Sequence, residues 1–130
     1  MADHPNVGLI SDGYKSFAAG DMDGLDKLFS DDVVWHVPGK SLVAGDYKGK
    51  EATFAYFGQL MELSEGTFKA DVHDIVGNGD HVIGLHHNSG KRNGNTLDAN
   101  EVLVFHMRDG KAVEAWDHHP DSAQWDSFWS

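Results

Sequence analysis

Asp117 and His119 have the residue types and the spacing that acid–base chemistry needs. They lie two positions apart near the end of the chain, a few residues after the turn sequence Asp109-Gly110. Alternate residues of a strand share a face, so the carboxyl group and the imidazole are expected to point the same way. If that face meets the aromatic helices of the first half, the chain has a small apolar pocket with a proton-transfer pair on its wall.

The turn at Asp109-Gly110 decides which residue lies opposite Asp117. A two-residue turn places Val102 there, whereas a three-residue turn with a left-handed bulge places Glu101 there. We favour the three-residue turn, because it gathers apolar and ionisable residues on one face: Glu101, Leu103, Phe105, Met107, Val113, Ala115, Asp117 and His119. Two carboxyl groups side by side in an apolar wall cannot both ionise cheaply, so one should keep its proton near neutral pH. His119 is then a base or the residue that orients Asp117.

Hydrophobic periodicity predicts helices in the first half of the chain and strands in the second. Apolar residues recur three or four positions apart in residues 7–19, 22–29 and 50–63, with Gly20 ending the first helix and Asp21 capping the second. Strand composition is found in residues 33–37, 67–76, 81–88, 97–107 and 111–119, and residues 122–129 suit a final helical turn. Gly- and Asn-rich turns suit antiparallel neighbours, so we predict an α+β fold with the helices on one face of a strongly bent antiparallel sheet.

Composition limits the number of domains and the classes of partner. A chain of 130 residues with 40% apolar residues is enough for one domain, which we expect to span residues 1–130. A net charge of −11 argues against nucleic-acid and membrane-surface partners. The chain has no apolar run of the roughly 18–20 residues that a membrane span needs, and its first residues lack the features of a signal peptide. We therefore expect a cytoplasmic protein.

The sequence predicts neither a metal nor a cofactor. With no cysteine, the chain has no thiolate ligand. Nine histidines are present, but the neighbours in His86-His87 and in His118-His119 point to opposite faces of a strand and cannot chelate together. No phosphate-binding loop, dinucleotide fingerprint or nucleophile elbow is found.

Aromatic and apolar residues from both halves are candidates for the pocket lining, and all of them also suit an ordinary core. The candidate ligand-binding residues are Tyr14, Phe17, Trp35, Val37, Phe54, Tyr56, Phe57, Leu103, Phe105 and Ala115. A ligand site would need a cavity of a few hundred Å³ with Asp117 on its wall. Trp116 and His118 should face the other way, towards solvent or a partner subunit.

Several segments resemble the nuclear-transport-factor-two-like superfamily, and within it the SnoaL-like polyketide cyclases and ketosteroid-isomerase-related proteins. These segments are residues 17–25, 28–33, 49–52, 109–111 and 114–117, so the resemblance runs in order along nearly the whole chain. It implies a cone-shaped, cystatin-like domain with three N-terminal helices and a deep apolar cavity between sheet and helices. It also implies a homodimer through the outer face of the sheet.

The resemblance transfers only part of the known catalytic residues. The ketosteroid-isomerase base position is occupied by Val37, the position of the hydrogen-bonding tyrosine is occupied by Gly13 next to Tyr14, and the second acid falls near Leu103. The aromatic pair of the third helix matches Tyr56 and Phe57. In the cyclases and epoxide hydrolases an acid projects from the last strand beside a tryptophan, and Trp116-Asp117 is similar to that arrangement.

Three functions are compatible with these residues. The first is a cofactor-independent enzyme of the isomerase, cyclase or lyase type, acting on a small hydrophobic, polyketide-like or other carbonyl compound. Asp117 would act as acid and base, His119 as its partner and Glu101 as a second acid. The second, which Val37 favours, is a binding or interaction protein without chemistry. The third is an epoxide-hydrolase-like enzyme, which requires an arginine between two acids, whereas Arg108 lies beside the turn.

Overall fold

Local sequence signals set the ends of the helices. In the computed structural model, which describes residues 3–130, α1 (Pro5–Ala19) begins with a proline and ends at Gly20, whose φ of 69° is left-handed. The side chain of Asp21 accepts a hydrogen bond from the Gly24 N–H and caps α2 (Met22–Leu28). The helices α3 (Lys50–Leu63) and α4 (Ser122–Phe128) complete the set. The predicted helices are confirmed, except that Phe29 begins a strand instead of ending α2.

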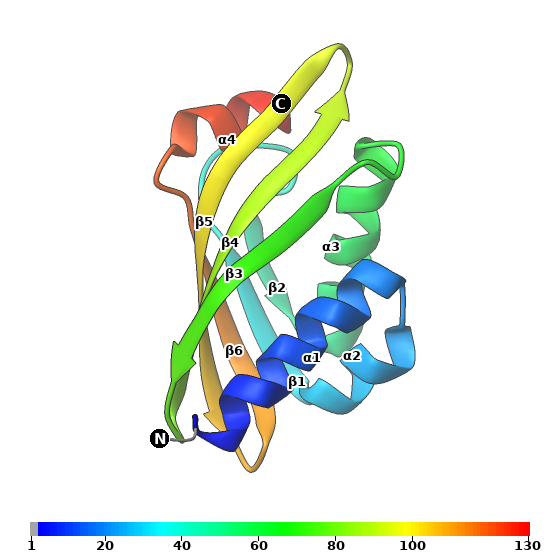
Figure 1. Cartoon of the computed structure of the whole chain (residues 1–130). Helices are drawn as coiled ribbons and strands as arrows, with labels where there is room; N and C mark the ends of the chain where they lie inside the picture. Colours follow the sequence, from blue (N-terminus) through cyan, green and yellow to red (C-terminus); the bar gives the residue numbers. More distant parts are fainter. Residues whose placement is uncertain (1–2) are drawn as a thin grey trace.

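Six strands form one curved sheet in the order β2-β1-β6-β5-β4-β3 (Figure 1). Their bounds are β1 (Phe29–Val37), β2 (Gly45–Lys48), β3 (Lys69–Gly77), β4 (His81–Arg92), β5 (Asn95–Arg108) and β6 (Lys111–His118). Neighbouring strands are antiparallel, with the exception of β1 and β6, which run parallel. The short edge strand β2 was not predicted, because its sequence Gly-Asp-Tyr-Lys has a single apolar side chain.

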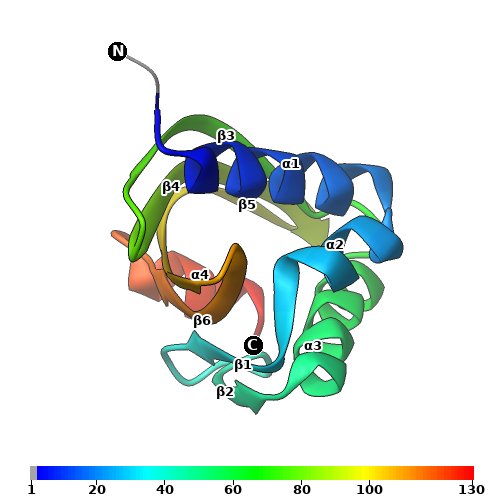
Figure 2. The same cartoon turned by 90° about the horizontal axis from the view of Figure 1, so that it is seen from below.

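The sheet curls so that helices cover its concave face. Helix α1 packs on β3 and β4, α2 on β1 and β6, α3 on β1 and β2, and α4 on β5. Viewed from below, α1, α2 and α3 close the side of the molecule that the curled sheet leaves open (Figure 2). This arrangement confirms the predicted α+β class, with the apolar core between the helices and the sheet. Within residues 3–130, no helix combines the length and the apolar character needed to cross a bilayer.

The connection between β5 and β6 differs from both predicted registers. Arg108 pairs with Lys111, so the turn has two residues, but the register then shifts at an extra residue, Val113. After this bulge Asp117 lies opposite Leu103, and neither Val102 nor Glu101 is its direct partner. Because the bulge moves the pairing by one residue, Asp117 returns to the inner face. The inward-facing residue before the bulge is Ala112, which is fully buried, whereas Val113 is only half-buried.

Candidate active site

A small apolar cavity lies between the helices and the concave face of the sheet. Its volume is about 70 Å³, below the few hundred Å³ that we predicted and below the roughly 300–1,000 Å³ of most small-molecule sites. The difference has a physical cause: aromatic rings fill much of the space in edge-to-face contacts. The ring centroid of Trp35 lies 5.0 Å from that of Phe57 and 5.8 Å from that of Phe29. The cavity therefore accepts a compact molecule, unless these rings move.

Seven of the ten predicted ligand-binding residues line this cavity: Tyr14, Phe17, Trp35, Tyr56, Phe57, Leu103 and Phe105. The other three do not. Val37 lies in the core at the end of β1, and Ala115 is fully buried beside Phe105, its partner across β5 and β6. Phe54 packs its ring against Phe29 and Phe57 from the outer part of α3. A sequence shows which residues are apolar, but not which of two buried layers they occupy.

Asp117 projects from β6 into the cavity wall and is only 4% exposed. Its Oδ1 accepts a hydrogen bond from the Trp35 indole N–H at 3.0 Å, and its Oδ2 accepts one from the Tyr56 hydroxyl at 3.1 Å. Burial and the nearby negative charge of Glu101 raise the pKa of Asp117 well above its usual range, and they outweigh the two hydrogen bonds, which act in the opposite direction. The surroundings of Asp117 therefore favour its protonated form.

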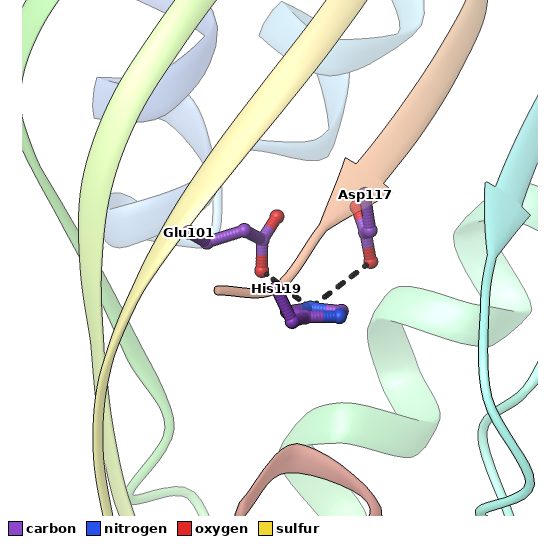
Figure 3. Close-up of side chains that lie close together, drawn as sticks. All are labelled: Glu101, Asp117 and His119. Atoms are coloured by element: carbon purple, nitrogen blue, oxygen red, sulfur yellow. Dashed lines mark hydrogen bonds and ion pairs between the residues drawn. The ribbon is translucent and has the colours of Figure 1, made fainter. Parts of the chain in front are cut away.

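Glu101, on the neighbouring strand β5, is equally buried but has different neighbours (Figure 3). Its Oε1 accepts hydrogen bonds from Nε2 of His119 at 3.0 Å and from the Asn88 amide at 2.8 Å, and Nε2 of His86 lies 3.5 Å away. Burial alone would raise the pKa of Glu101, but the hydrogen bonds and charges of His119 and His86 lower it below its usual range. Among residues 3–130, no donor is bonded to the second oxygen, Oε2.

His119 stands behind the two acids and not in the cavity wall. Its Nε2 is 4.0 Å from Oδ2 of Asp117, and its ring stacks on Trp125 of α4 with centroids 4.0 Å apart. The cavity lining does not include it. The structure thus brings the three predicted catalytic residues together, with Asp117 and Glu101 facing the cavity and His119 supporting Glu101.

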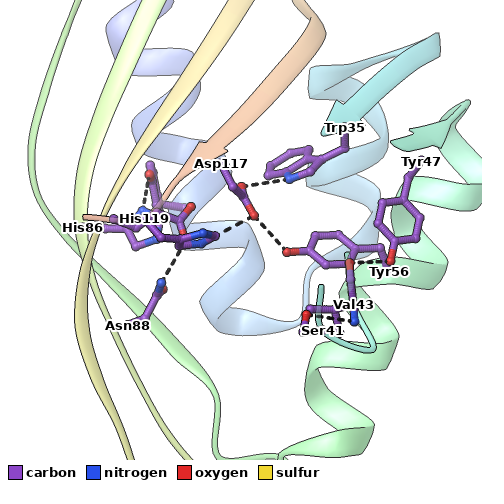
Figure 4. A network of polar contacts seen from close by, with 11 residues as sticks. Trp35, Ser41, Val43, Tyr47, Tyr56, His86, Asn88, Asp117 and His119 are labelled. Atoms are coloured by element: carbon purple, nitrogen blue, oxygen red, sulfur yellow. Dashed lines mark hydrogen bonds and ion pairs between the residues drawn. The ribbon is translucent and has the colours of Figure 1, made fainter. Parts of the chain in front are cut away.

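His86 joins this network and was not predicted as a site residue. Its Nδ1 is 2.7 Å from the Tyr14 hydroxyl, and both residues line the cavity. Figure 4 shows His86 in the same polar network as His119, Asn88 and Asp117. The sequence did carry a signal for His86. Asn93-Gly94 is a two-residue hairpin turn, with φ of 51° and 81°, and this turn places His86 directly opposite Glu101. The predicted strands end at residue 88 and resume at residue 97, so they stop short of this turn and define no register between them.

The remaining residues that entered the sequence argument lie outside the cavity. Trp116 is half-buried on the outer face of the sheet, where its ring stacks on His36, and His118 is exposed. Arg108 is exposed at the end of β5, so no arginine stands between the two acids in the described part of the chain.

One oxygen or nitrogen atom from each of Glu101, Asp117 and His119 lies within 4.8 Å of the other two, a spacing that could also hold a metal ion. The observed contacts have a different character. Oε1 of Glu101 already accepts N–H groups from His119 and Asn88, which is the pattern of a hydrogen-bonded carboxylate. A metal would need to displace those protons from the imidazole.

The fold and the site define a class of protein in which a curved sheet and its helices enclose a small cavity with acids on its wall. Residues 10–115 match the family model of the SnoaL-like domain, and the chain belongs to this family.

Solved structures extend this likeness over nearly the whole chain. Bal32a, from a soil-derived mobile gene cassette, is 40% identical with a TM-score of 0.93, and the match covers 96% of each chain. A protein of unknown function from Xanthomonas campestris, described as having a cystatin-like fold, is 32% identical with a TM-score of 0.90, covering 96% of this chain and 98% of that one. IdmH from Streptomyces antibioticus, for which polyketide cyclase activity has been proposed, is 23% identical with a TM-score of 0.75, covering 94% of this chain and 99% of IdmH. Together with neighbours described as nuclear-transport-factor-two-like, these matches confirm the predicted fold family.

Proposed function

We propose that this protein is a cofactor-independent acid–base enzyme of the isomerase, cyclase or lyase type, acting on a small hydrophobic carbonyl compound. One observation carries the proposal: two neighbouring buried carboxyl groups have surroundings that favour opposite protonation states. Three N–H groups surround Oε1 of Glu101, whereas Asp117 lies among aromatic rings next to that negative charge. Acid and base roles in enzymes are commonly separated in this way.

The two carboxyl groups have complementary tasks in this proposal. Oε2 of Glu101 removes a proton from the carbon next to the substrate carbonyl, and the electron pair of the broken C–H bond moves towards the carbonyl oxygen. The protonated carboxyl group of Asp117 donates a hydrogen bond to that oxygen and stabilises the enolate. Glu101 then returns the proton to another atom of the substrate. His119 is a positioning residue for Glu101, a change from the sequence-based assignment, in which Asp117 was the main acid and base.

The comparisons support the proposal at the level of the family. The chain belongs to the SnoaL-like family, and polyketide cyclase activity has been proposed for the structural neighbour IdmH. The substrate of this chain is proposed only as a chemical class, because the cavity lining is mostly aromatic and aliphatic.

A second candidate is a ligand-binding or interaction protein without chemistry, and the size of the cavity favours it. A volume of about 70 Å³ leaves little space beside the acids, and both oxygens of Asp117 already have partners. Epoxide hydrolysis has no such support, because Arg108 lies away from the site.

Hydrogen–deuterium exchange tests the two candidates directly. Pentan-2-one is incubated with the protein in D₂O, and loss of the protons next to the carbonyl is followed by NMR. We expect wild-type exchange above the buffer rate, and a decrease of about 10²–10⁴-fold in Glu101→Gln, where the base is lost. Asp117→Asn should also lose exchange while it still binds the ketone.

Asp12→Asn is the matched control, because Asp12 is exposed on α1 and does not line the cavity. Wild-type protein that binds pentan-2-one and exchanges no faster than buffer would establish the binding function instead.

A further inference from the structure

The polar groups of the cavity wall form two contacts, which meet where His86 lies beside Glu101. Glu101 and Asp117 form one on β5 and β6, and Tyr14 and His86 form the other between α1 and β4. We propose that the Tyr14–His86 pair binds a hydroxyl group of the ligand, so that the ligand is a compact hydroxy-carbonyl compound. This inference rests on the proposed function only for the carbonyl group of the ligand, which the proposed function places at Glu101 and Asp117.

The Tyr14 oxygen can accept a hydrogen bond from a ligand. Nε2 of His86 lies 3.5 Å from Oε1 of Glu101. Because that oxygen accepts N–H groups, we place a proton on Nε2 of His86. Nδ1 of His86 is 2.7 Å from the Tyr14 hydroxyl oxygen. Whichever of these two groups donates, the Tyr14 oxygen keeps a further lone pair, which a ligand hydroxyl can use.

The inner face of β4 leaves space for the Tyr14 hydroxyl group. Gly84 lies two residues before His86, and a Cβ atom at Gly84 would be 2.4 Å from the Tyr14 oxygen. The backbone of Gly84 does not require glycine, because its φ is outside the left-handed region. The absence of a side chain is therefore explained by the position of the Tyr14 hydroxyl group.

Most of the wall around the two polar contacts is apolar. Asp117 and His86 project from β6 and β4, with β5 between them, so their backbones are roughly 10 Å apart at the usual strand spacing. Glu101 on β5 lies opposite His86, with its Oε1 3.5 Å from Nε2. The rest of the wall near them is apolar, with Leu103 and Phe105 from the sheet and Phe57 and Leu60 from the helices. A ligand with an oxygen at each end would satisfy both contacts, whereas a hydroxyl group placed among these apolar side chains without a partner would weaken binding.

A pair of ligands of equal size tests the inference. Pentan-2-one and 4-hydroxybutan-2-one have the same number of non-hydrogen atoms, and they differ by a terminal methyl or hydroxyl group. Their dissociation constants are measured by NMR titration for wild type and Tyr14→Phe, which forms a double-mutant cycle between ligand and protein. We expect the hydroxyketone to bind wild type at least as tightly as the ketone. In Tyr14→Phe the affinity ratio should shift by about tenfold towards the ketone.

Two further variants make the result independent of the stability of Tyr14→Phe. Tyr47→Phe removes a hydroxyl group that donates to the Val43 carbonyl outside the cavity, and it should leave the ratio unchanged. Gly84→Ala keeps the tyrosine but displaces its hydroxyl group, and it should shift the ratio in the same direction as Tyr14→Phe.

An equal ratio in wild type and Tyr14→Phe would overturn the inference, as would failure of both ligands to bind. The exchange assay separates this result from the proposed function. If wild-type protein prefers the hydroxyketone but does not exchange the protons next to the ligand carbonyl, the Tyr14–His86 contact is supported and the proposed enzymatic function is rejected. Exchange of pentan-2-one by a protein whose affinity ratio for the two ligands is the same in wild type and Tyr14→Phe would keep the enzyme and reject the second contact.

Discussion

At the scale of single residues, the site shows how surroundings separate two chemically similar groups. Glu101 and Asp117 are both 4% exposed and lie on neighbouring strands. Glu101 is surrounded by N–H donors on one oxygen, whereas Asp117 has two donors that do not compensate for burial beside a negative charge. The difference between them comes from His86, His119 and Asn88, and no property of the acids themselves would reveal it.

The raised pKa of Asp117 predicts how stability depends on pH. A group whose pKa is raised by folding contributes stability that is fully present below its unfolded value, near 3.9, and is lost as the pH rises through the folded value. Asparagine does not titrate. The free energy of unfolding of Asp117→Asn should therefore increase relative to wild type as the pH rises above about 4, by no more than about 1.4 kcal/mol per pH unit.

Urea unfolding at several pH values measures this difference, with Asp12→Asn as the exposed control. A constant difference between wild type and Asp117→Asn over the whole range would show that Asp117 ionises normally in the fold.

At the scale of elements, one extra residue in β6 determines which side chains reach the cavity. The bulge at Val113 corrects the register that the two-residue turn would impose, and Asp117 faces inward as a result. If Val113 instead paired regularly after the two-residue turn, Trp116 and His118 would occupy the inner face. With this number of residues between the turn and Asp117, the bulge is therefore what keeps the acid on the inner face.

Deletion of Val113 tests this role. We expect the deletion to leave a regular ladder in which Asp117 still lies opposite Leu103, so the fold should survive with a change in unfolding free energy of about 1 kcal/mol. Val113→Ala keeps the residue count and should cost about 1 kcal/mol, because Val113 is half-buried. Thermal unfolding followed by circular dichroism compares the two variants, and loss of the fold on deletion would contradict the assignment of Val113 as the extra residue.

At the scale of the whole molecule, the outer face of the sheet carries a row of aromatic rings. The ring centroids of His36 and Trp116 are 5.2 Å apart, those of Trp116 and His106 are 4.5 Å apart, and those of His106 and His81 are 4.5 Å apart. Half-buried apolar side chains adjoin this row: Ile83, Leu85, Val102 and Val104. We propose this face as the interface of a homodimer, as the family resemblance implies.

Substitution at Trp116 tests the dimer. Sedimentation equilibrium should give a dimer mass for wild type and a shift towards monomer for Trp116→Lys, because a charge at the centre of an apolar interface is costly to bury. Met22→Lys, at an exposed residue on α2, is the control and should leave the mass unchanged. A monomeric wild type at all concentrations would reject the proposal.

The sequence by itself determined the elements and the fold family. Hydrophobic periodicity, the Gly20 and Asp21 helix boundaries and the turn residues are local signals, and they gave α1, α3 and the four later strands nearly at their observed positions. The alternation of side chains along the last strand also placed Asp117 and His119 on one face, because residues two apart in a strand point the same way whatever the register with the partner strand.

The tertiary structure alone decided which residues share the cavity. The bulge at Val113 and the edge strand β2 left no strong local pattern, and the pairing of His86 with Glu101 joins strands through a register that we had not assigned. The volume of the cavity depends on how the rings of Trp35, Phe29 and Phe57 fill it. Registers and packing are relations between distant segments, and protonation follows from them, so none of these features can be obtained from one segment alone.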